Sequence, residues 1–132
     1  MRRVFADAFF YLTLLNARDR AYRSARQWAA QSDLNCVTTE FVLLEVADAL
    51  SAPTARRQSA AFLRALRRDC STRVIPLSPD LMEEGLQLFE QRTDKTWTLT
   101  DCTSFVAMRR EGLTDALTGD QHFAQAGYGP LL

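Results

Sequence analysis

The sequence predicts an α/β fold of three layers, α/β/α, around a short and mainly parallel central sheet. Short apolar runs that are typical of buried strands alternate with longer segments that have helical periodicity. This alternation favours βαβ units, in which helices cover both faces of a parallel sheet. No Pro- or Gly-rich linker divides the 132 residues, so we expect residues 1–132 to form a single domain.

Each expected element has a local signal in the sequence. Strands are predicted at residues 3–6, 36–37, 73–76 and 115–118. Helices are predicted at about residues 9–15, 17–31, 39–50, 55–69, 79–91, 99–110 and 120–126. Thr38 or Thr39 is expected to cap the third helix. Thr98 or Thr100 is expected to cap the sixth helix, and Gly112 is expected to end it.

Charge is balanced overall but unevenly distributed. The formal net charge is zero, from 16 basic and 16 acidic residues. Between Thr54 and Arg73 there are six arginines and one acid, and in a helix over residues 55–69 most of these arginines lie opposite an apolar stripe. Arginine binds phosphate in a bidentate manner, so the cluster suits nucleic acid. A bias of genome composition toward arginine explains it equally well.

The composition also excludes some classes of protein. No apolar run is long enough to span a bilayer, and a charge interrupts the N-terminal apolar stretch, so we expect no secretory signal there. The three cysteines, Cys36, Cys70 and Cys102, lack CxxC spacing, so we expect reduced thiols in a cytoplasmic protein. The single histidine, His122, excludes a histidine-rich zinc site and is expected to order the last helical turn.

Four acids in apolar surroundings are predicted to share one site. Asp7 follows the first strand, and Asp120 follows the last predicted strand after Gly119, which is expected to let the backbone turn sharply. Sites in parallel sheets form at the carboxyl ends of strands. Glu45 lies in FVLLEVADAL, a helix that is apolar on nearly all sides. Asp101 lies in TLTDCTSFVAM, in the first turn of an otherwise apolar helix.

Each acid also has a purely structural explanation. Asp7 could cap the helix that follows it, and Asp101 could form a capping pair with Thr98. Asp120 could be a turn residue, and Glu45 could pair with an arginine. Both explanations stay open for each acid taken alone.

Taken together, the four acids favour a bound cation. Carboxylates that meet at one sheet edge repel strongly unless they bind protons or a metal ion. Oxygen ligands without a histidine cluster indicate Mg²⁺ or Mn²⁺. We therefore expect a divalent cation to hold Asp7 in its charged form, with Asp48 as a possible outer acid of the same site.

The order VFAD, TTEFVLLEVADAL, LTDCTSF and LTGDQHF resembles the PIN-domain ribonucleases, especially the VapC-type toxins of bacterial toxin–antitoxin pairs. The resemblance implies a PIN-like nuclease domain whose catalytic and metal-binding residues are Asp7, Glu45, Asp101 and Asp120. It also implies that the hydroxyls of Thr100 and Thr118 orient these carboxylates. The chain departs from the family pattern after Asp7, where Ala8 and Phe9 replace the usual small hydroxyl residue.

The predicted function is that of a metal-dependent endoribonuclease, in which Mg²⁺ or Mn²⁺ assists hydrolysis of RNA phosphodiester bonds. Arginines of the helices near residues 18–30 and 55–69, including Arg57, Arg64 and Arg68, are expected to hold the RNA backbone. The resemblance further implies tRNA or ribosomal RNA as substrate, a homodimer, and a small antitoxin that blocks the site. Two alternatives remain: a housekeeping PIN nuclease of RNA processing, and a non-catalytic RNA- or protein-binding module that retains the fold.

Overall fold

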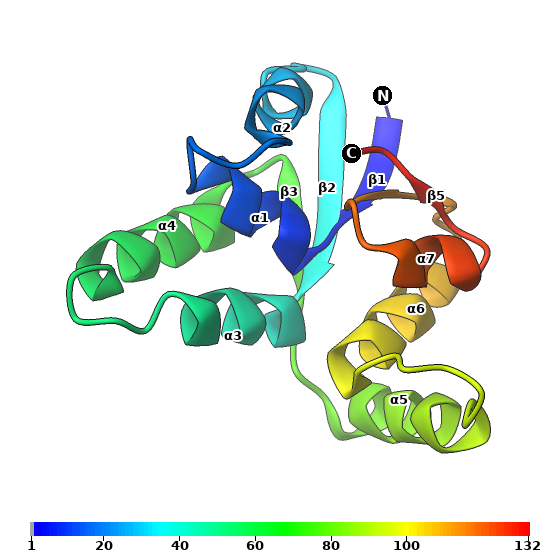
Figure 1. Cartoon of the computed structure of the whole chain (residues 1–132). Helices are drawn as coiled ribbons and strands as arrows, with labels where there is room; N and C mark the ends of the chain where they lie inside the picture. Colours follow the sequence, from blue (N-terminus) through cyan, green and yellow to red (C-terminus); the bar gives the residue numbers. More distant parts are fainter. Residues whose placement is uncertain (1) are drawn as a thin grey trace.

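A five-stranded sheet of order β3-β2-β1-β4-β5 forms the centre of the molecule, and its neighbouring strands are all parallel (Figure 1). The computed structural model describes residues 2–132. The strands are β1 Arg2–Ala6, β2 Leu34–Thr39, β3 Thr72–Ile75, β4 Asp115–Leu117 and β5 Gly129–Pro130. The helices are α1 Ala8–Leu14, α2 Tyr22–Ala29, α3 Glu40–Ala49, α4 Arg56–Arg68, α5 Pro79–Gln91, α6 Leu99–Glu111 and α7 Gln121–Gln125.

The helices form two layers, one on each side of the sheet. Helices α1, α2 and α4 lie on one side, and α5, α6 and α7 lie on the other (Figure 1). Helix α3 runs below the carboxyl end of β2 and contacts both α4 and α6. The central strand β1 is the most deeply buried, because Val4, Phe5 and Ala6 have no exposed surface. The predicted three-layer α/β/α fold with a parallel sheet is confirmed.

The structure decides between the two expected caps of α3 and of α6. Thr39 caps α3, because its hydroxyl accepts a hydrogen bond from the Val42 amide at 3.2 Å. The Thr38 hydroxyl instead donates to the Ala6 carbonyl at 2.8 Å and ties β2 to β1. Thr98 is the residue that caps α6.

Helix α6 is buried along most of its length, which explains why its sequence is apolar on all sides. Gly112 ends it in the left-handed conformation, with φ of 68°, as predicted. Its neighbour α5 approaches closely at Gly85, where an added Cβ would lie 2.6 Å from Thr103 Cγ2. These contacts position α6 beside the carboxyl edge of the sheet.

Two elements differ from the prediction. The second helix begins at Tyr22 instead of residue 17, because side chains of the preceding segment bind backbone amides and turn the chain. Asn16 accepts from the Arg18 amide at 3.1 Å, and Asp19 accepts from the Ala21 amide at 2.9 Å. The edge strand β5 was not expected, since a Gly-Pro pair carries no strand signal.

Among residues 2–132, no helix is both long enough and apolar enough to cross a membrane.

Candidate functional site

Asp7 and Thr118 meet because they directly follow two neighbouring strands. In the pairing of β1 with β4, Ala6 lies opposite Leu117, so the next residue of each strand lies at the same edge. The Thr118 hydroxyl donates to Asp7 Oδ2 at 2.9 Å and accepts from the Asp120 amide at 3.0 Å. Asp7 is 5% exposed, and its side chain makes no capping hydrogen bond to α1. The capping explanation of Asp7 therefore finds no support.

Asp101 is the second residue of the capping box of α6, whose N-cap is Thr98, and it faces the site at the same time. Its Oδ2 accepts from the Thr98 amide at 3.0 Å, and its own amide donates to the Thr98 hydroxyl at 3.0 Å. The same Oδ2 lies 2.9 Å from His122 Nδ1. The capping pair is present, but it fixes the carboxylate in the site and does not remove it.

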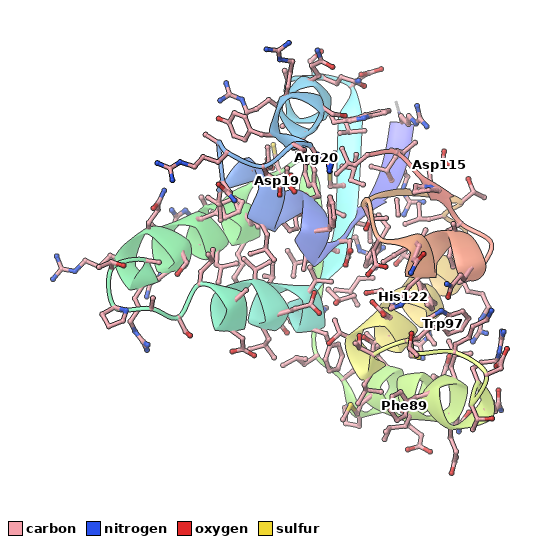
Figure 2. All side chains as sticks on the ribbon, in the orientation of Figure 1. Asp19, Arg20, Phe89, Trp97, Asp115 and His122 are labelled. Carbon is pink, nitrogen blue, oxygen red and sulfur yellow. The ribbon has the colours of Figure 1, made fainter. Side chains whose placement is uncertain are left out.

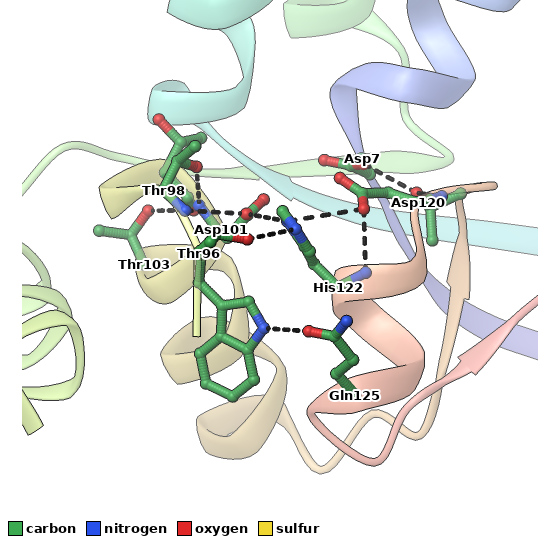
Figure 3. A network of polar contacts seen from close by, with 11 residues as sticks. Asp7, Thr96, Thr98, Asp101, Thr103, Asp120, His122 and Gln125 are labelled. Atoms are coloured by element: carbon green, nitrogen blue, oxygen red, sulfur yellow. Dashed lines mark hydrogen bonds and ion pairs between the residues drawn. The ribbon is translucent and has the colours of Figure 1, made fainter. Parts of the chain in front are cut away.

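Asp120 and His122 belong to one turn at the start of α7. Asp120 is the N-cap of this helix, and its Oδ1 accepts from the His122 amide at 2.9 Å. His122 Nδ1 lies 3.6 Å from Asp120 Oδ1, so the imidazole lies between the carboxylates of Asp120 and Asp101 (Figure 3). One possible ligand atom from each of these three residues lies within 4.8 Å of the others.

His122 is the residue of this site that sequence reasoning missed. It was expected only to order the last turn, whereas its ring contacts two of the predicted acids. The signal that could have found it is the Asp-Gln-His spacing at a helix start. The side chain of an N-cap residue binds the amide two positions on and so stays close to that residue.

Glu45 extends from α3 toward the same edge and is half-buried. Its pKa is raised to about 7, mainly by burial and then by the charges of Asp7, Asp101 and Asp120, in that order of importance. Among residues 2–132, no arginine forms an ion pair with Glu45. The arginine-pair explanation therefore finds no support.

Asp7 has a raised pKa for similar reasons. Its pKa is raised to about 6, mainly by burial; the hydrogen bond from Thr118 opposes this shift, and the carboxylates of Asp101 and Asp120 add to it. The structure thus gathers negative charge at this edge without a neighbouring arginine or lysine to balance it, within the part of the chain it describes. Carboxylate oxygens with one imidazole fit a small divalent cation.

Other predicted residues lie elsewhere or act differently. Thr100 contributes its backbone carbonyl, which accepts from the Thr103 hydroxyl at 2.8 Å, and no hydrogen bond joins its hydroxyl to a site carboxylate within residues 2–132. The expectation that Asp48 is an outer acid of the site was wrong. Asp48 is exposed and lines a hollow between α3 and α4, because the three residues from Glu45 to Asp48 fall about 60° short of a full helical turn.

The role assigned to Gly119 also needs correction. The glycines with positive φ are Gly112 and Gly127 among residues 2–132, so Gly119 does not adopt a turn that only glycine favours. Instead it leaves room for a side chain, because an added Cβ would lie 2.6 Å from Phe9 Cζ. Phe9, one of the two residues that depart from the family pattern, thus packs over the loop that carries Asp120.

The arginines predicted to hold RNA lie on α4, across the sheet from α6 and α7 (Figure 1). Arg57, Arg64 and Arg68 are exposed, and the first two line a hollow of about 510 Å³ between α3 and α4. The structure therefore brings the four acids together but does not bring these arginines into the acid cluster.

Comparison with known proteins identifies the family. Residues 4–128 match the PIN domain, so the chain belongs to the PIN domain family, and the predicted resemblance is confirmed. The chain is 29% identical over 126 residues to VapC20 of Mycobacterium tuberculosis, named a 23S rRNA-specific endonuclease, and the match covers 95% of both proteins.

Solved structures agree with this assignment. The crystal structure of Mycobacterium tuberculosis VapC20, titled a Sarcin-Ricin loop cleaving toxin, matches with a TM-score of 0.84 at 28% identity and covers 95% of each chain. FitAcB from Neisseria gonorrhoeae matches with a TM-score of 0.66 at 12% identity, covering 98% of this chain and 96% of that chain. The second match shows a shared fold.

Proposed function

We propose that this chain is the toxin of a VapC-type toxin–antitoxin pair, a divalent-cation-dependent endoribonuclease that works as one domain over residues 1–132. The observation that carries the proposal is that Asp101 and Asp120 converge at one sheet edge and that their charges act on two further buried or half-buried acids, in a chain similar to VapC20 over 95% of its length. The four acids are Asp7, Glu45, Asp101 and Asp120.

The chemistry follows from the charges at this edge. A divalent cation held there would supply Lewis-acid stabilisation of the scissile phosphate and would make a nearby water molecule more acidic. The four carboxylates would hold Mg²⁺ or Mn²⁺. Asp7 and Glu45 must first lose their protons, since burial raises their pKa values to about 6 and about 7. Thr118 keeps Asp7 oriented, and the Thr98 cap fixes Asp101.

The substrate we propose is structured RNA, with ribosomal RNA ahead of tRNA. The name of VapC20 as a 23S rRNA-specific endonuclease supports this order, because the similarity spans both chains. Arg57, Arg64 and Arg68 would bind phosphates that lie away from the scissile bond. Such RNA would be met in the cytoplasm.

We also propose a homodimer and a small antitoxin as partners. Met82, Leu86 and Phe89 are exposed and, at helical spacing, lie on one face of α5. Phe89 points outward from α5 (Figure 2). A second copy that covers this face would remove the cost of exposing it to water. Leu86→Glu with Phe89→Glu should then give a monomer in light scattering.

One experiment tests the nuclease proposal directly. The purified protein is incubated with a 23S rRNA fragment that contains the sarcin–ricin loop, and separately with tRNA, in Mg²⁺, in Mn²⁺ and in EDTA. We expect metal-dependent cleavage at a defined position of the rRNA fragment, and none by Asp7→Asn. Equal cleavage in EDTA, or by Asp7→Asn, would contradict the proposal. Tight RNA binding without any cleavage would favour the non-catalytic alternative.

A further inference from the structure

His122 is the one nitrogen donor that the fold places among the predicted acids. Its Nδ1 lies 2.9 Å from Asp101 Oδ2 and 3.6 Å from Asp120 Oδ1 (Figure 3). It is also the only histidine in the chain. The ring is therefore the sole imidazole that any bound cation can meet.

Both neighbours of the ring are held in place by the backbone. The Asp120 carboxylate accepts a hydrogen bond from the His122 amide, and the Asp101 carboxylate accepts one from the Thr98 amide. The second ring nitrogen, Nε2, lies 3.4 Å from the Thr96 hydroxyl. If Nε2–H donates to Thr96, Nδ1 keeps a free lone pair that points between the two carboxylates.

The separations suit a shared cation. Ligand atoms at about 2.1 Å from a small divalent cation stand about 3 Å apart when they are adjacent. The two distances from Nδ1 are close to this spacing, and all three ligand atoms lie within 4.8 Å of one another. Asp7, 5% exposed, feels the charges of the same two carboxylates; it accepts a hydrogen bond from the Thr118 hydroxyl and forms no ion pair with a cationic side chain among residues 2–132.

We propose that His122 binds the catalytic cation directly through Nδ1, together with Asp101 and Asp120. The inference rests on the proposed function, which supplies the cation. An imidazole ligand favours transition metals over Mg²⁺, whose preferred ligands are oxygen atoms. The site therefore selects Mn²⁺ over Mg²⁺, and His122 is the residue that sets this preference.

The first test detects the metal–nitrogen bond. The protein is made without a histidine tag, loaded with Mn²⁺, and studied by electron spin echo envelope modulation. Because the chain has one histidine, feeding ¹⁵N-histidine labels only His122. We expect a directly coordinated nitrogen whose modulation pattern changes from ¹⁴N to ¹⁵N on labelling. An unchanged pattern overturns the inference, and this result does not depend on the folding of any variant.

The second test measures selectivity by calorimetry with Mn²⁺ and with Mg²⁺ at one fixed pH. In His122→Ala we expect Mn²⁺ affinity to fall at least about tenfold, and Mg²⁺ affinity to fall much less. Gln121→Ala is the control, since Gln121 is an exposed residue of the same helix. Equal losses for the two metals would mean that His122 acts only by holding Asp101, and would overturn the inference.

RNA cleavage by the unaltered protein in Mg²⁺ separates the two proposals. Cleavage without metal–imidazole coupling rejects the role of His122 alone. Coupling without cleavage of any RNA rejects the proposed function and leaves a metal site whose use is different.

Discussion

The two parts of this chain carry opposite net charge, and they differ in how many of their arginines form ion pairs with acids. Residues 2–73 hold twelve arginines and seven acids, whereas residues 74–132 hold four basic residues and nine acids. Among residues 2–132, no ion pair involves an arginine of α2 or α4. In the second part, Arg92, Arg109 and Arg110 all pair with nearby acids. A net charge of zero thus conceals a strong separation of charge.

The difference indicates two binding surfaces for ligands of opposite charge. The arginines of α2 and α4, which form no ion pairs, attract phosphate. The sheet edge that carries Asp7, Glu45, Asp101 and Asp120, called the acid edge below, attracts a cation. Asp7 and Glu45 belong to the arginine-rich part of the sequence, yet the fold carries them to the acid edge. The parallel sheet is what allows this, because it brings the carboxyl ends of β1 and β4 together.

The largest expected effect concerns the acid edge. Asp7→Asn should lower RNA cleavage by at least about a hundredfold, because removing a cation ligand costs several kcal/mol of transition-state stabilisation. RNA binding should change little, since α4 is untouched. The measurement is the rate of cleavage at saturating RNA, with Asp80→Asn, an exposed acid of α5, as control. Parallel loss of binding and cleavage would break the division into two surfaces.

The second effect concerns stability without metal. Asp7 has its pKa raised from 3.8 to about 6, so between about pH 4 and pH 6 the folded protein binds protons that the unfolded chain releases. The free energy of unfolding should therefore fall as the pH rises through this range, by about 3 kcal/mol for Asp7. Glu45, raised to about 7, should extend the fall to that pH.

Urea unfolding in EDTA at pH 4.5, 6 and 8 measures this dependence. Asp7→Asn should remove part of the fall and be the more stable protein at pH 8. Added Mn²⁺ should restore stability to the unaltered protein at pH 8, because it binds the folded state. The same pH dependence in both proteins would show that Asp7 carries no such penalty.

A third, smaller effect concerns the contact between Gly119 and Phe9, beside the acid edge. Gly119→Ala should destabilise the protein by about 1–3 kcal/mol, because the new methyl group overlaps the Phe9 ring. Phe9→Leu should recover part of this loss in the double variant. Thermal unfolding of the single and double variants measures the loss of stability and its recovery. Additive losses would mean that the two residues do not compete for the same space.

The smallest effect concerns the arginine surface. Arg64→Ala with Arg68→Ala should lower the salt slope of RNA binding by about 1.5 units, because each phosphate contact contributes about 0.7 to 0.9. Arg109→Ala with Arg110→Ala, which removes two arginines paired with Glu84, should lower it less. Equal slopes in the two double variants would indicate that α4 meets a protein partner. A change in oligomeric state or in inhibition by the antitoxin would then be expected.

Much of the fold could be predicted because helix caps and strand ends are local signals. Thr39, Thr98 and Gly112 bound their helices as the sequence indicates. The position of His122 could not be predicted in the same way. It depends on the direction of α7, which the Asp120 cap and the end of β4 determine together. A contact of this kind requires the relative placement of two elements, which periodicity does not encode.

The errors have a similar cause. Asp48 was grouped with Glu45 because three residues nearly complete a helical turn, yet the position is rotated far enough to face α4. Gly119 was assigned a turn, whereas the reason for its small size is a ring from α1. In both cases the deciding neighbour is distant in the sequence.

The hydrogen bonds of Thr118 have one more consequence. Its hydroxyl accepts a hydrogen bond from the Asp120 amide and donates its only hydrogen bond to Asp7 Oδ2. That donation takes one of about four lone pairs of the Asp7 carboxylate and fixes the direction in which Oδ1 points. A proton and a metal ion both need the lone pairs that remain, and a metal ligand must be deprotonated. Metal binding at Asp7 should therefore release a proton wherever the pH lies below the raised pKa of about 6.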